Sequence, residues 1–525
     1  MTGGRVLAMS VAVADDRVYR IPFSMLIKYM SVPQMMKWST TSKAFRKAVF
    51  VRVPRFTIHL HGPEQLVRAL SMKNTFREVR FTVDMKNALD RWNQIGIHRR
   101  EVETQKMKRR GPGPSFGRPW LMEKKEWEVL DQKDDEECGV TTSRLESEAL
   151  SASWMDEDLK LLGDRVTSLD LNTGGRDPLV TGDGVRALSG LTSLSLRGVK
   201  TIGDGVVSAL PGLTSLDLRQ NEMISDHGIR PLRHLTTLYL DSESPVTDDE
   251  LQRHTGLTDL DIARHPTITD AGICALVHLR RLVLHIAPRI TGTGFVGMTQ
   301  LTSLDLGGGR SPVTDEILRG VPSLTQLNLW ANETVTDEGV RCLKQLRSLC
   351  LRANRTITDR GIEDLTSLTV LDLSMSSGVT DAGLVRLTNL VSLDISNTSR
   401  IKGTSFSGLV NLTELSLAKT SVVDRELLLL APHGRLRLLN LRAHRGGITD
   451  KGIERFHGLS TLDLSHMNEI TADGLLPLVA LRTLNLLSND KIGDSEIATI
   501  TSVNGARITR VDKFWNHFCG CSPFD

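Results

Sequence analysis

The chain has 525 residues, of which 40% are hydrophobic, 24% charged and 4% aromatic. This ordinary globular balance excludes wholesale disorder, a collagen-like fibre and a small disulfide-stapled scaffold. Because 65 basic residues face 62 acidic ones, the formal net charge is only +3, and charge alone predicts no general attraction to nucleic acid or membranes.

Residues 1–18 form the first segment. Arg5 precedes an apolar run from Val6 to Ala14, which is shorter than the roughly 15 to 30 residues of a secretory signal. We therefore expect an uncleaved and flexible amino-terminal segment. Nowhere does the sequence approach the roughly 18 uninterrupted apolar residues that would span a bilayer.

Three short helices are predicted in residues 19–50. They cover residues 21–30, residues 31–38, which begin with Ser31 and Pro33, and the basic, amphipathic residues 41–49. The order of Ile-Pro, apolar helix, Ser-x-Pro and basic helix resembles an F-box. The resemblance implies docking on the Skp-type linker subunit of a cullin-RING (SCF-type) ubiquitin ligase.

The F-box-like pattern departs from its family in two places. Phe23 and Ser24 stand where acidic residues are common, and Phe45 stands where a Trp is usual. A helical cap that shields the first repeat of a solenoid is the alternative interpretation. If the segment is a working box, its apolar docking residues are Ile21, Pro22, Met25, Leu26, Met30 and Met36.

Residues 51–83 are interpreted as two degenerate repeats. Val53–Ile58 and Phe76–Phe81 lie 23 residues apart, and each resembles a strand. Residues 84–150 interrupt this pattern with a basic cluster at 106–110, a Gly-Pro run at 111–114 and an acidic cluster at 134–137. We expect a charged, partly disordered insertion there, because the segment has little apolar surface to bury.

A repeat of about 22 residues organises residues 151–513. Its motif is L-x-x-L-x-L, with a variant that opens at Val166 and a degenerate copy at Ile508, which makes sixteen copies. The regular copies begin at Leu191, Leu213, Leu235, Leu257, Leu279, Leu301, Leu324, Leu346, Leu368, Leu390, Leu412, Leu436, Leu459 and Leu481.

Each copy predicts the same local structure. The alternating leucines, as in residues 213–218, form a short strand whose leucines face the core. About six residues later comes Thr-Asp followed by Gly and an apolar residue, as in residues 269–273, and Thr or Asp there can cap a helical turn. No copy can bury its leucines alone, so neighbouring copies must stack around one shared core.

The pattern resembles the leucine-rich repeat family, in particular the intracellular subtype with I-T-D-x-G-I in its second half. The resemblance implies an α/β solenoid with a parallel sheet on the concave face and short helices on the convex face. The loop Asn of that family matches only Asn221, Asn332, Asn354 and Asn489, so we expect an irregular hydrogen-bond ladder inside the turn. Sixteen strands would give an inner arc of roughly 70 Å, long enough to hold a protein domain.

The strand positions between and after the last two leucines should face solvent on the concave side. The position between them is often Asp, which we interpret as a solubilising ladder. Aromatic and basic residues depart from this pattern, and such residues dominate binding hot spots. Trp330 and Arg352, one repeat apart, should stand side by side, and Arg197 and Arg219 should flank them. The predicted partner site comprises Arg197, Arg219, Tyr239, His285, Trp330, Arg352 and Arg442.

The sequence contains no known catalytic, cofactor-binding or metal-binding motif. His517, Cys519 and Cys521 lie close together but lack a zinc-site spacing, so residues 514–525 are interpreted as a C-terminal cap. We therefore predict no enzyme, no cofactor, no metal and no small-molecule substrate. Membrane and nucleic-acid partners are not expected either.

The predicted function is a non-catalytic adaptor that selects a protein substrate for a ubiquitin ligase, with the substrate on the concave face. One alternative is a cytoskeletal or regulatory leucine-rich-repeat scaffold without a ligase link. The other is a secreted or surface adhesin, which would need the run from Val6 to Ala14 to act as a signal. The six cysteines form no clustered caps, which favours a reducing compartment and an intracellular, cytoplasmic location, with the nucleus also open.

Overall fold

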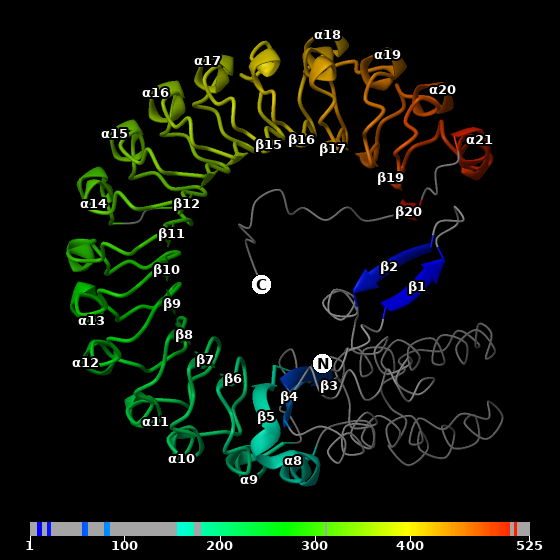
Figure 1. Ribbon diagram of the computed structural model, residues 1–525. Coiled ribbons are helices and arrows are strands. Elements are labelled where there is room, and N and C mark those ends of the chain that lie inside the picture. Colours follow the sequence, from blue (N-terminus) through cyan, green and yellow to red (C-terminus); the bar gives the residue numbers. More distant parts are fainter. Residues whose placement is uncertain are drawn as a thin grey trace, which may run out of the picture. The chain divides into compact units, whose positions relative to one another are not determined.

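The computed structural model describes residues 8–12, 18–22, 55–60, 78–84, 155–172, 180–309, 312–504 and 509–511 (Figure 1). The chain divides into two compact units, Met1–Leu216 and Asp217–Asp525. Residues 85–150, which hold the predicted insertion, and the predicted C-terminal cap lie outside the described residues.

The first unit opens with an antiparallel pair of strands, β1 (Ala8–Ala12) and β2 (Val18–Pro22). The structure differs here from the prediction, because Ile21 and Pro22 end a strand instead of beginning a helix. Val, Tyr and Ile favour strands, and the main chain of β2 finds its hydrogen-bond partner in β1. The remaining predicted docking residues, Met25, Leu26, Met30 and Met36, lie outside the described residues.

A parallel pair follows in the first unit. β3 (Arg55–Leu60) pairs with β4 (Glu78–Asp84) so that Arg55 lies opposite Glu78, and both strands begin two residues after the expected ones. β4 pairs in turn with β5 (Val166–Asp170), although 81 residues separate the two strands in sequence. The remaining elements are α8 (Asp156–Leu162), the 3-10 helix η2 (Gly163–Arg165), α9 (Gly182–Arg186), β6 (Ser193–Ser195) and α10 (Asp204–Val207).

Every predicted copy of the repeat contains a strand. β7 (Ser215–Asp217) holds the boundary between the units, and from β8 to β20 each strand pairs in parallel with the next, so that Leu282 lies opposite Leu304. The predicted parallel sheet is confirmed. Its strands are β8 (Thr237–Tyr239), β9 (Asp259–Asp261), β10 (Arg281–Val283), β11 (Ser303–Asp305), β12 (Gln326–Asn328), β13 (Ser348–Cys350), β14 (Val370–Asp372), β15 (Ser392–Asp394), β16 (Glu414–Ser416), β17 (Leu438–Asn440), β18 (Thr461–Asp463), β19 (Thr483–Asn485) and β20 (Thr509–Val511).

Short helices alternate with these strands. In the second unit the helices lie on the outer side and the strands on the inner, concave side (Figure 1). They are α11 (Asp226–Ile229), α12 (Asp248–Leu251), α13 (Asp270–Ile273), η3 (Thr293–Phe295), α14 (Asp315–Arg319), α15 (Asp337–Val340), α16 (Asp359–Ile362), α17 (Asp381–Leu384), η4 (Phe406–Gly408), α18 (Asp424–Leu427), η5 (Leu428–His433), α19 (Asp450–Ile453), α20 (Ala472–Leu475) and α21 (Asp494–Asn504).

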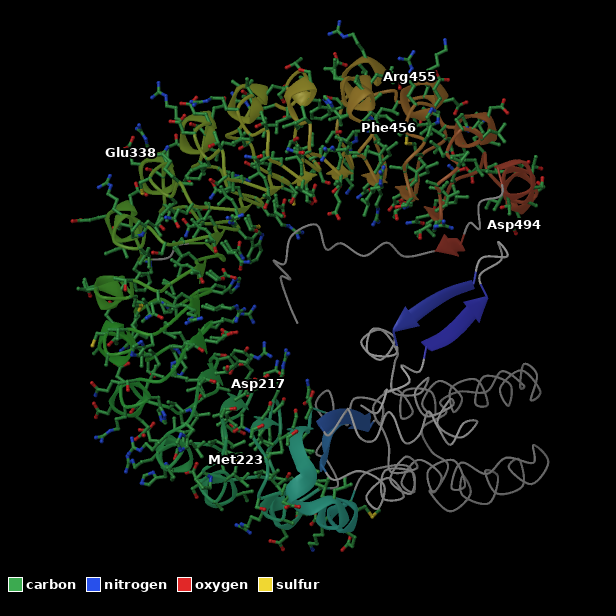
Figure 2. All side chains as sticks on the ribbon, in the orientation of Figure 1. Asp217, Met223, Glu338, Arg455, Phe456 and Asp494 are labelled. Carbon is green, nitrogen blue, oxygen red and sulfur yellow. The ribbon has the colours of Figure 1, made fainter. Side chains whose placement is uncertain are left out.

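The core of the second unit lies between its strands and its helices. Leu346, Leu349 and Leu351, the three leucines of one motif, are fully buried. The side chains of Glu338 and Arg455 point outward from the convex side (Figure 2). Stacked repeats therefore share one apolar core, as the motif predicts.

The Thr-Asp-x-Gly segment joins each repeat to the next. Thr269 caps α13 by accepting the N–H of Ala271. Asp248 of the preceding repeat accepts the N–H of Thr269 at 2.9 Å and its hydroxyl at 2.6 Å. A Cβ on Gly272 would lie 2.3 Å from Oδ1 of Asp248, so the carboxylate occupies the space that glycine leaves open. Thr269, Thr336 and Thr380 therefore have the predicted capping role, whereas Thr358 and Thr449 make no such bond. The Asp of this segment links neighbouring repeats.

This Asp–Thr link recurs along the second unit. It joins Asp226 to Thr247, Asp270 to Thr291, Asp315 to Thr336, Asp337 to Thr358, Asp359 to Thr380, Asp424 to Thr449 and Asp450 to Thr471.

In the second unit, two repeats carry glycine at the position of the linking Asp. The positions are Gly292 before η3 and Gly403 before η4, and the following repeats have Ile317 and Glu426 in place of the usual glycine. A Cβ on Gly292 would lie 2.7 Å from Cγ2 of Ile317, and one on Gly403 would lie 3.0 Å from Cβ of Glu426. Side-chain packing therefore replaces the Asp–Thr link at these two junctions.

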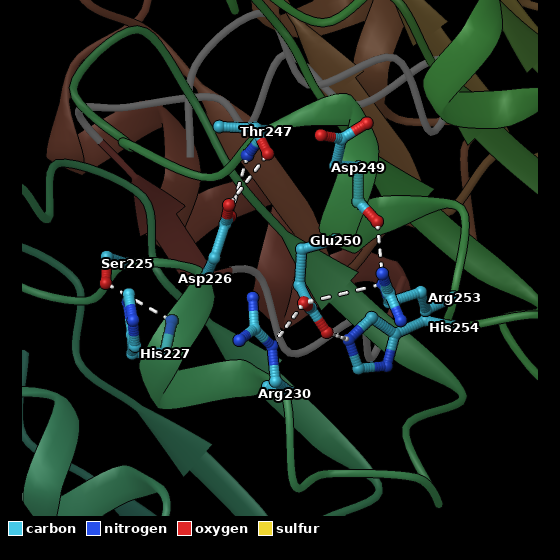
Figure 3. A network of polar contacts seen from close by, with 9 residues as sticks. All are labelled: Ser225, Asp226, His227, Arg230, Thr247, Asp249, Glu250, Arg253 and His254. Atoms are coloured by element: carbon cyan, nitrogen blue, oxygen red, sulfur yellow. Dashed lines mark hydrogen bonds and ion pairs between the residues drawn. The ribbon is translucent and has the colours of Figure 1, made fainter.

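Glu250 also stands at the position of the usual glycine, in α12. Its side chain is 1% exposed, and its carboxylate lies 2.9 Å from Nε of Arg230 and 3.5 Å from Nε2 of His254 (Figure 3). Burial lowers the pKa of His254, although the nearby carboxylate raises it. A buried carboxylate needs such partners, because ionised groups are costly to remove from water.

The loop Asn is replaced in several repeats, as predicted. Asn354 is fully buried, and its amide makes five hydrogen bonds of 2.9–3.2 Å, two to carbonyl oxygens, two from backbone N–H groups and one from the hydroxyl of Thr356. His444 takes this position in another repeat, and each of its ring nitrogens lies within 3.1 Å of a carbonyl oxygen. The expected irregular ladder is therefore confirmed.

Candidate binding surface

Three positions in each repeat of the second unit face the concave side. They are the residue before the central leucine of the strand, the residue after it, and the residue after the last leucine. We call them the first, middle and following positions. In β10 they are Arg281, Val283 and His285, which alternate with the buried Leu282 and Leu284. Because side chains alternate across a strand, these three point away from the leucine core.

The Asp and Asn residues at the middle positions, which we call the middle row, take part in the turn that ends each strand. Oδ1 of Asp261 accepts the backbone N–H of Ala263 at 2.9 Å, and Oδ1 of Asp305 accepts that of Gly307 at 2.9 Å. Such a bond to the residue two positions along stabilises a turn. The row therefore shapes the backbone, a role that goes beyond the predicted solubilising ladder. The same bond is made by Asp217, Asn328, Asp372, Asp394, Asn440, Asp463 and Asn485.

The residue after the following position forms the rim of the concave face. Its N–H donates to the carbonyl oxygen of the following residue in the next repeat, as from Ala331 to Arg352 at 2.8 Å. Rim residues of neighbouring repeats therefore lie side by side. The rim residues with positive φ angles are Gln220, Arg264, Ile286, Gly308, Ala331, Ala353, Met375, Asn397, Lys419, Ala443, His466 and Ser488.

Arg219 and Tyr239 form one preformed group. Nε and Nη2 of Arg219 bond to the two carboxylate oxygens of Asp217 at 3.0 and 2.7 Å, and the guanidinium lies 5.2 Å from the ring centre of Tyr239. The hydrogen bond to Asp217 raises the pKa of Arg219, and burial raises the pKa of Tyr239. Arg197, predicted to flank the site with Arg219, is half-buried and belongs to the first unit.

His285 and Trp330 stack on each other across an intervening strand. Their ring centres are 5.3 Å apart and their planes differ by 8°. Between them β11 contributes Gly307, so no side chain separates the rings. A Cβ on the next residue, Gly308, would lie 2.9 Å from Cε1 of His285 and 2.6 Å from Cγ1 of Ile286. The two glycines therefore make room for the stack. Burial lowers the pKa of His285, which favours the neutral form of its ring.

Arg352 occupies the strand next to Trp330, as predicted, because β12 and β13 pair directly. The ring of Trp330 nevertheless packs on His285, two strands away on its other side, where Gly307 leaves space. Arg352 is half-buried, and no ion pair joins it to another described residue. Its charge is therefore available on the concave face.

Two charged residues on β9 and β10 were not predicted as partner-site residues: Arg281 was not considered, and Asp261 was interpreted only as part of the solubilising row. Nη1 of Arg281 lies 3.0 Å from Oδ1 of Asp259. Burial raises the pKa of Asp261 to about 6, although the N–H of Ala263 and the guanidinium groups of Arg219 and Arg281 lower it. Arg281 could have been found from the sequence, because it departs from the Ser or Thr that is common at the first position. The burial of Asp261 could not have been found in this way, because Asp is the usual residue at the middle position.

A small pocket of about 140 Å³ opens over β10–β13. Its lining is mostly polar, and none of the predicted partner-site residues contributes to it. Its lining offers hydrogen-bond donors and acceptors. The pocket is lined by Arg281, Val283, Ser303, Leu304, Asp305, Gln326, Leu327, Asn328 and Ser348.

Arg442 lies apart from the other predicted residues. It follows β17, five strands after β12, and its side chain is exposed. Within the described ranges, no group of three or more His, Cys, Asp or Glu side chains is placed to hold a metal ion. None of the helices described is long and apolar enough to cross a membrane.

Comparisons with known proteins identify the repeat. The family model described as Leucine Rich repeat matches residues 211–232. A search of curated protein sequences found no match. A leucine-rich-repeat protein of Leptospira interrogans is 21% identical over 69% of this chain and 99% of its own, with a TM-score of 0.46. An internalin of Listeria monocytogenes is also 21% identical, over 61% of this chain and 91% of its own, with a TM-score of 0.43.

The repeats described by the structure therefore form a leucine-rich-repeat solenoid, with strands on the concave face and short helices on the convex face of the second unit. This class of fold generally serves as a non-catalytic binding scaffold.

Proposed function

We propose that this chain is a non-catalytic scaffold that binds a partner protein on the concave face of its second unit, around β8–β13. The observation that carries the proposal is the His285–Trp330 stack, with Arg352 on the adjoining strand. Aromatic and arginine side chains supply most of the binding energy at protein interfaces. Here they stand at the ends of strands whose turns are fixed by bonds such as that of Asp305.

The geometry of these side chains also favours binding. The two rings are already stacked, and Arg219 is already bonded to Asp217 and lies over Tyr239. A partner therefore need not order them, which saves about 0.5–1.5 kcal/mol for each side chain that would otherwise become immobilised.

The test is capture of partner proteins from an extract of the source organism by the full chain. Replacing Trp330 and Arg352 together with Ala should leave the circular dichroism spectrum unchanged and abolish the capture of at least one protein. The matched control replaces Glu338 and Arg341, an exposed ion pair on convex helix α15, with Ala. If the variant at Trp330 and Arg352 still captures every protein that the control variant captures, the proposed binding site on the concave face is wrong.

We also propose the finer function, that of an intracellular substrate-recognition subunit of an SCF-type ubiquitin ligase. Its support is the resemblance of residues 19–50 to an F-box. Of the six predicted docking residues, Ile21 and Pro22 lie among the described residues, in strand β2. The test is a pull-down with the purified linker subunit of the same organism. Binding that is lost when Ile21, Pro22 and Leu26 are replaced with Ala would support the adaptor. If neither protein binds, the scaffold function stands without the ligase link.

A further inference from the structure

An exposed apolar stretch lies on the rim beside the His285–Trp330 stack. Ile286 and Met375 at its ends are 46% and 49% exposed, and the three residues between them are small. Rim residues follow one another through N–H bonds to the next repeat, so the stretch is continuous over β10–β14. We call it the apolar rim, and it consists of Ile286, Gly308, Ala331, Ala353 and Met375.

From β9 to β17 the charges around the apolar rim have one sign, and the nearest acidic residue at these positions, Asp241 after β8, accepts the backbone N–H of Gln220. At the following and rim positions from β9 to β17, four residues are charged and all four are basic: Arg264, Arg352, Lys419 and Arg442. The side chains of Arg264, Lys419 and Arg442 are exposed. The described rim therefore presents apolar surface flanked by positive charge on both sides.

The carboxylates of the middle row lie deeper in the concave face. Those of Asp261 and Asp305 accept backbone N–H groups, and Asp372, nearest to Met375, is only 5% exposed. A chain segment lying along the rim would meet the exposed basic side chains first. Charge complementarity therefore favours an acidic segment.

We propose that the apolar rim binds an extended, acidic segment of a partner protein that carries an aromatic or large aliphatic side chain. This inference rests on the proposed concave binding site and adds the chemistry of the partner. Four steps of about 4.8 Å from Ile286 to Met375 span about 19 Å, which matches about six residues of extended chain. The small rim residues give the large side chain its place next to Trp330, and acidic residues on either side reach Arg264 and Lys419.

The experiment selects peptides of about twelve random residues, displayed on phage, against the full chain at about 0.1 M salt. The retained peptides should combine an aromatic or large aliphatic residue with an excess of Asp and Glu. A synthetic copy of the most frequent peptide is then titrated by fluorescence anisotropy. Ala353→Glu and Lys419→Glu should each weaken its binding roughly tenfold. Lys451→Glu, an exposed lysine on convex helix α19, is the matched control and should leave binding unchanged.

Circular dichroism and thermal melting establish that the three variants fold like the original chain. Retained peptides that are basic or neutral, a selection that retains none, or binding that ignores both rim variants would overturn the inference. Basic or neutral peptides whose binding is lost on Trp330→Ala would overturn only the acidic partner and leave the concave binding site standing. Loss of the natural partner in the capture experiment tests that site independently.

Discussion

Asp261→Asn should stabilise the protein at pH 7.5 and leave its stability unchanged near pH 4. Burial raises the pKa of Asp261 from 3.8 to about 6, so the folded chain binds more protons than the unfolded chain between these pH values. Stability of the original protein must therefore fall as the pH rises from about 4 to about 6. Asn carries no charge and removes this loss.

The pKa difference gives the size of the effect. A rise of the pKa from 3.8 to about 6 means that ionising Asp261 costs the folded chain about 3 kcal/mol more than the unfolded chain. This amount of stability is missing above pH 7, where the carboxyl group is ionised in both states. Asn can still accept the N–H of Ala263, as Asn328 does in its own turn, but a neutral acceptor is weaker than a carboxylate. We therefore expect a net gain of about 2 kcal/mol at pH 7.5.

Urea denaturation followed by circular dichroism at pH 4 and pH 7.5 measures this gain. Asp261→Ala is the matched control, because it removes the charge and also the acceptor of the Ala263 N–H. It should gain about 1 kcal/mol less than Asn. An equal gain at both pH values, or a loss at pH 7.5, would refute the assignment of the cost to the buried charge.

Three further predictions concern the repeats. Gly339→Ala should lower the free energy of unfolding by about 2 kcal/mol, because its Cβ would lie 2.4 Å from Oδ1 of Asp315, whereas Gly212→Ala, with its nearest atom 3.6 Å away, should not. Asn354→Ala should cost about 3 kcal/mol because this buried side chain makes five hydrogen bonds, and an unchanged urea midpoint would contradict this. Burial lowers the pKa of His254 below its unfolded value, so the unfolded chain binds more protons and the melting temperature should fall between about pH 7 and 5, less steeply in His254→Gln.

The strands of the repeat could be predicted from sequence because their register has only one solution. A slip of one residue would turn leucines such as Leu349 from the core to the solvent. The Asp–Thr link could not be predicted by local rules. Its partners lie 21 residues apart, as in Asp248 and Thr269, and only stacking brings them together. At Ile21 and Pro22, local helix signals were outweighed by pairing with β1.

The candidate site was predicted residue by residue, but its contacts were not. Trp330 and His285 were found as departures from the repeat pattern. No side chain at Gly307 separates the rings, and a Cβ on Gly308 would lie 2.9 Å from Cε1 of His285, yet in sequence both glycines look like ordinary turn residues. Two ion pairs, Arg219–Asp217 and Arg281–Asp259, also depend on side-chain rotamers. The repeat pattern does not encode these rotamers.

The glycines at 292 and 403 have a mechanical consequence. Cooperativity in a solenoid passes only between neighbouring repeats, so these two junctions, where side-chain packing stands in place of the Asp–Thr link, should be among the first to separate when the chain is stretched. The second unit would then yield in blocks of several repeats. His285 belongs to the block that ends with η3, and Trp330 belongs to the block that begins with β11. The His285–Trp330 stack therefore spans the junction between these two blocks of repeats. A partner bound to both rings would hold the two blocks together when the chain is stretched.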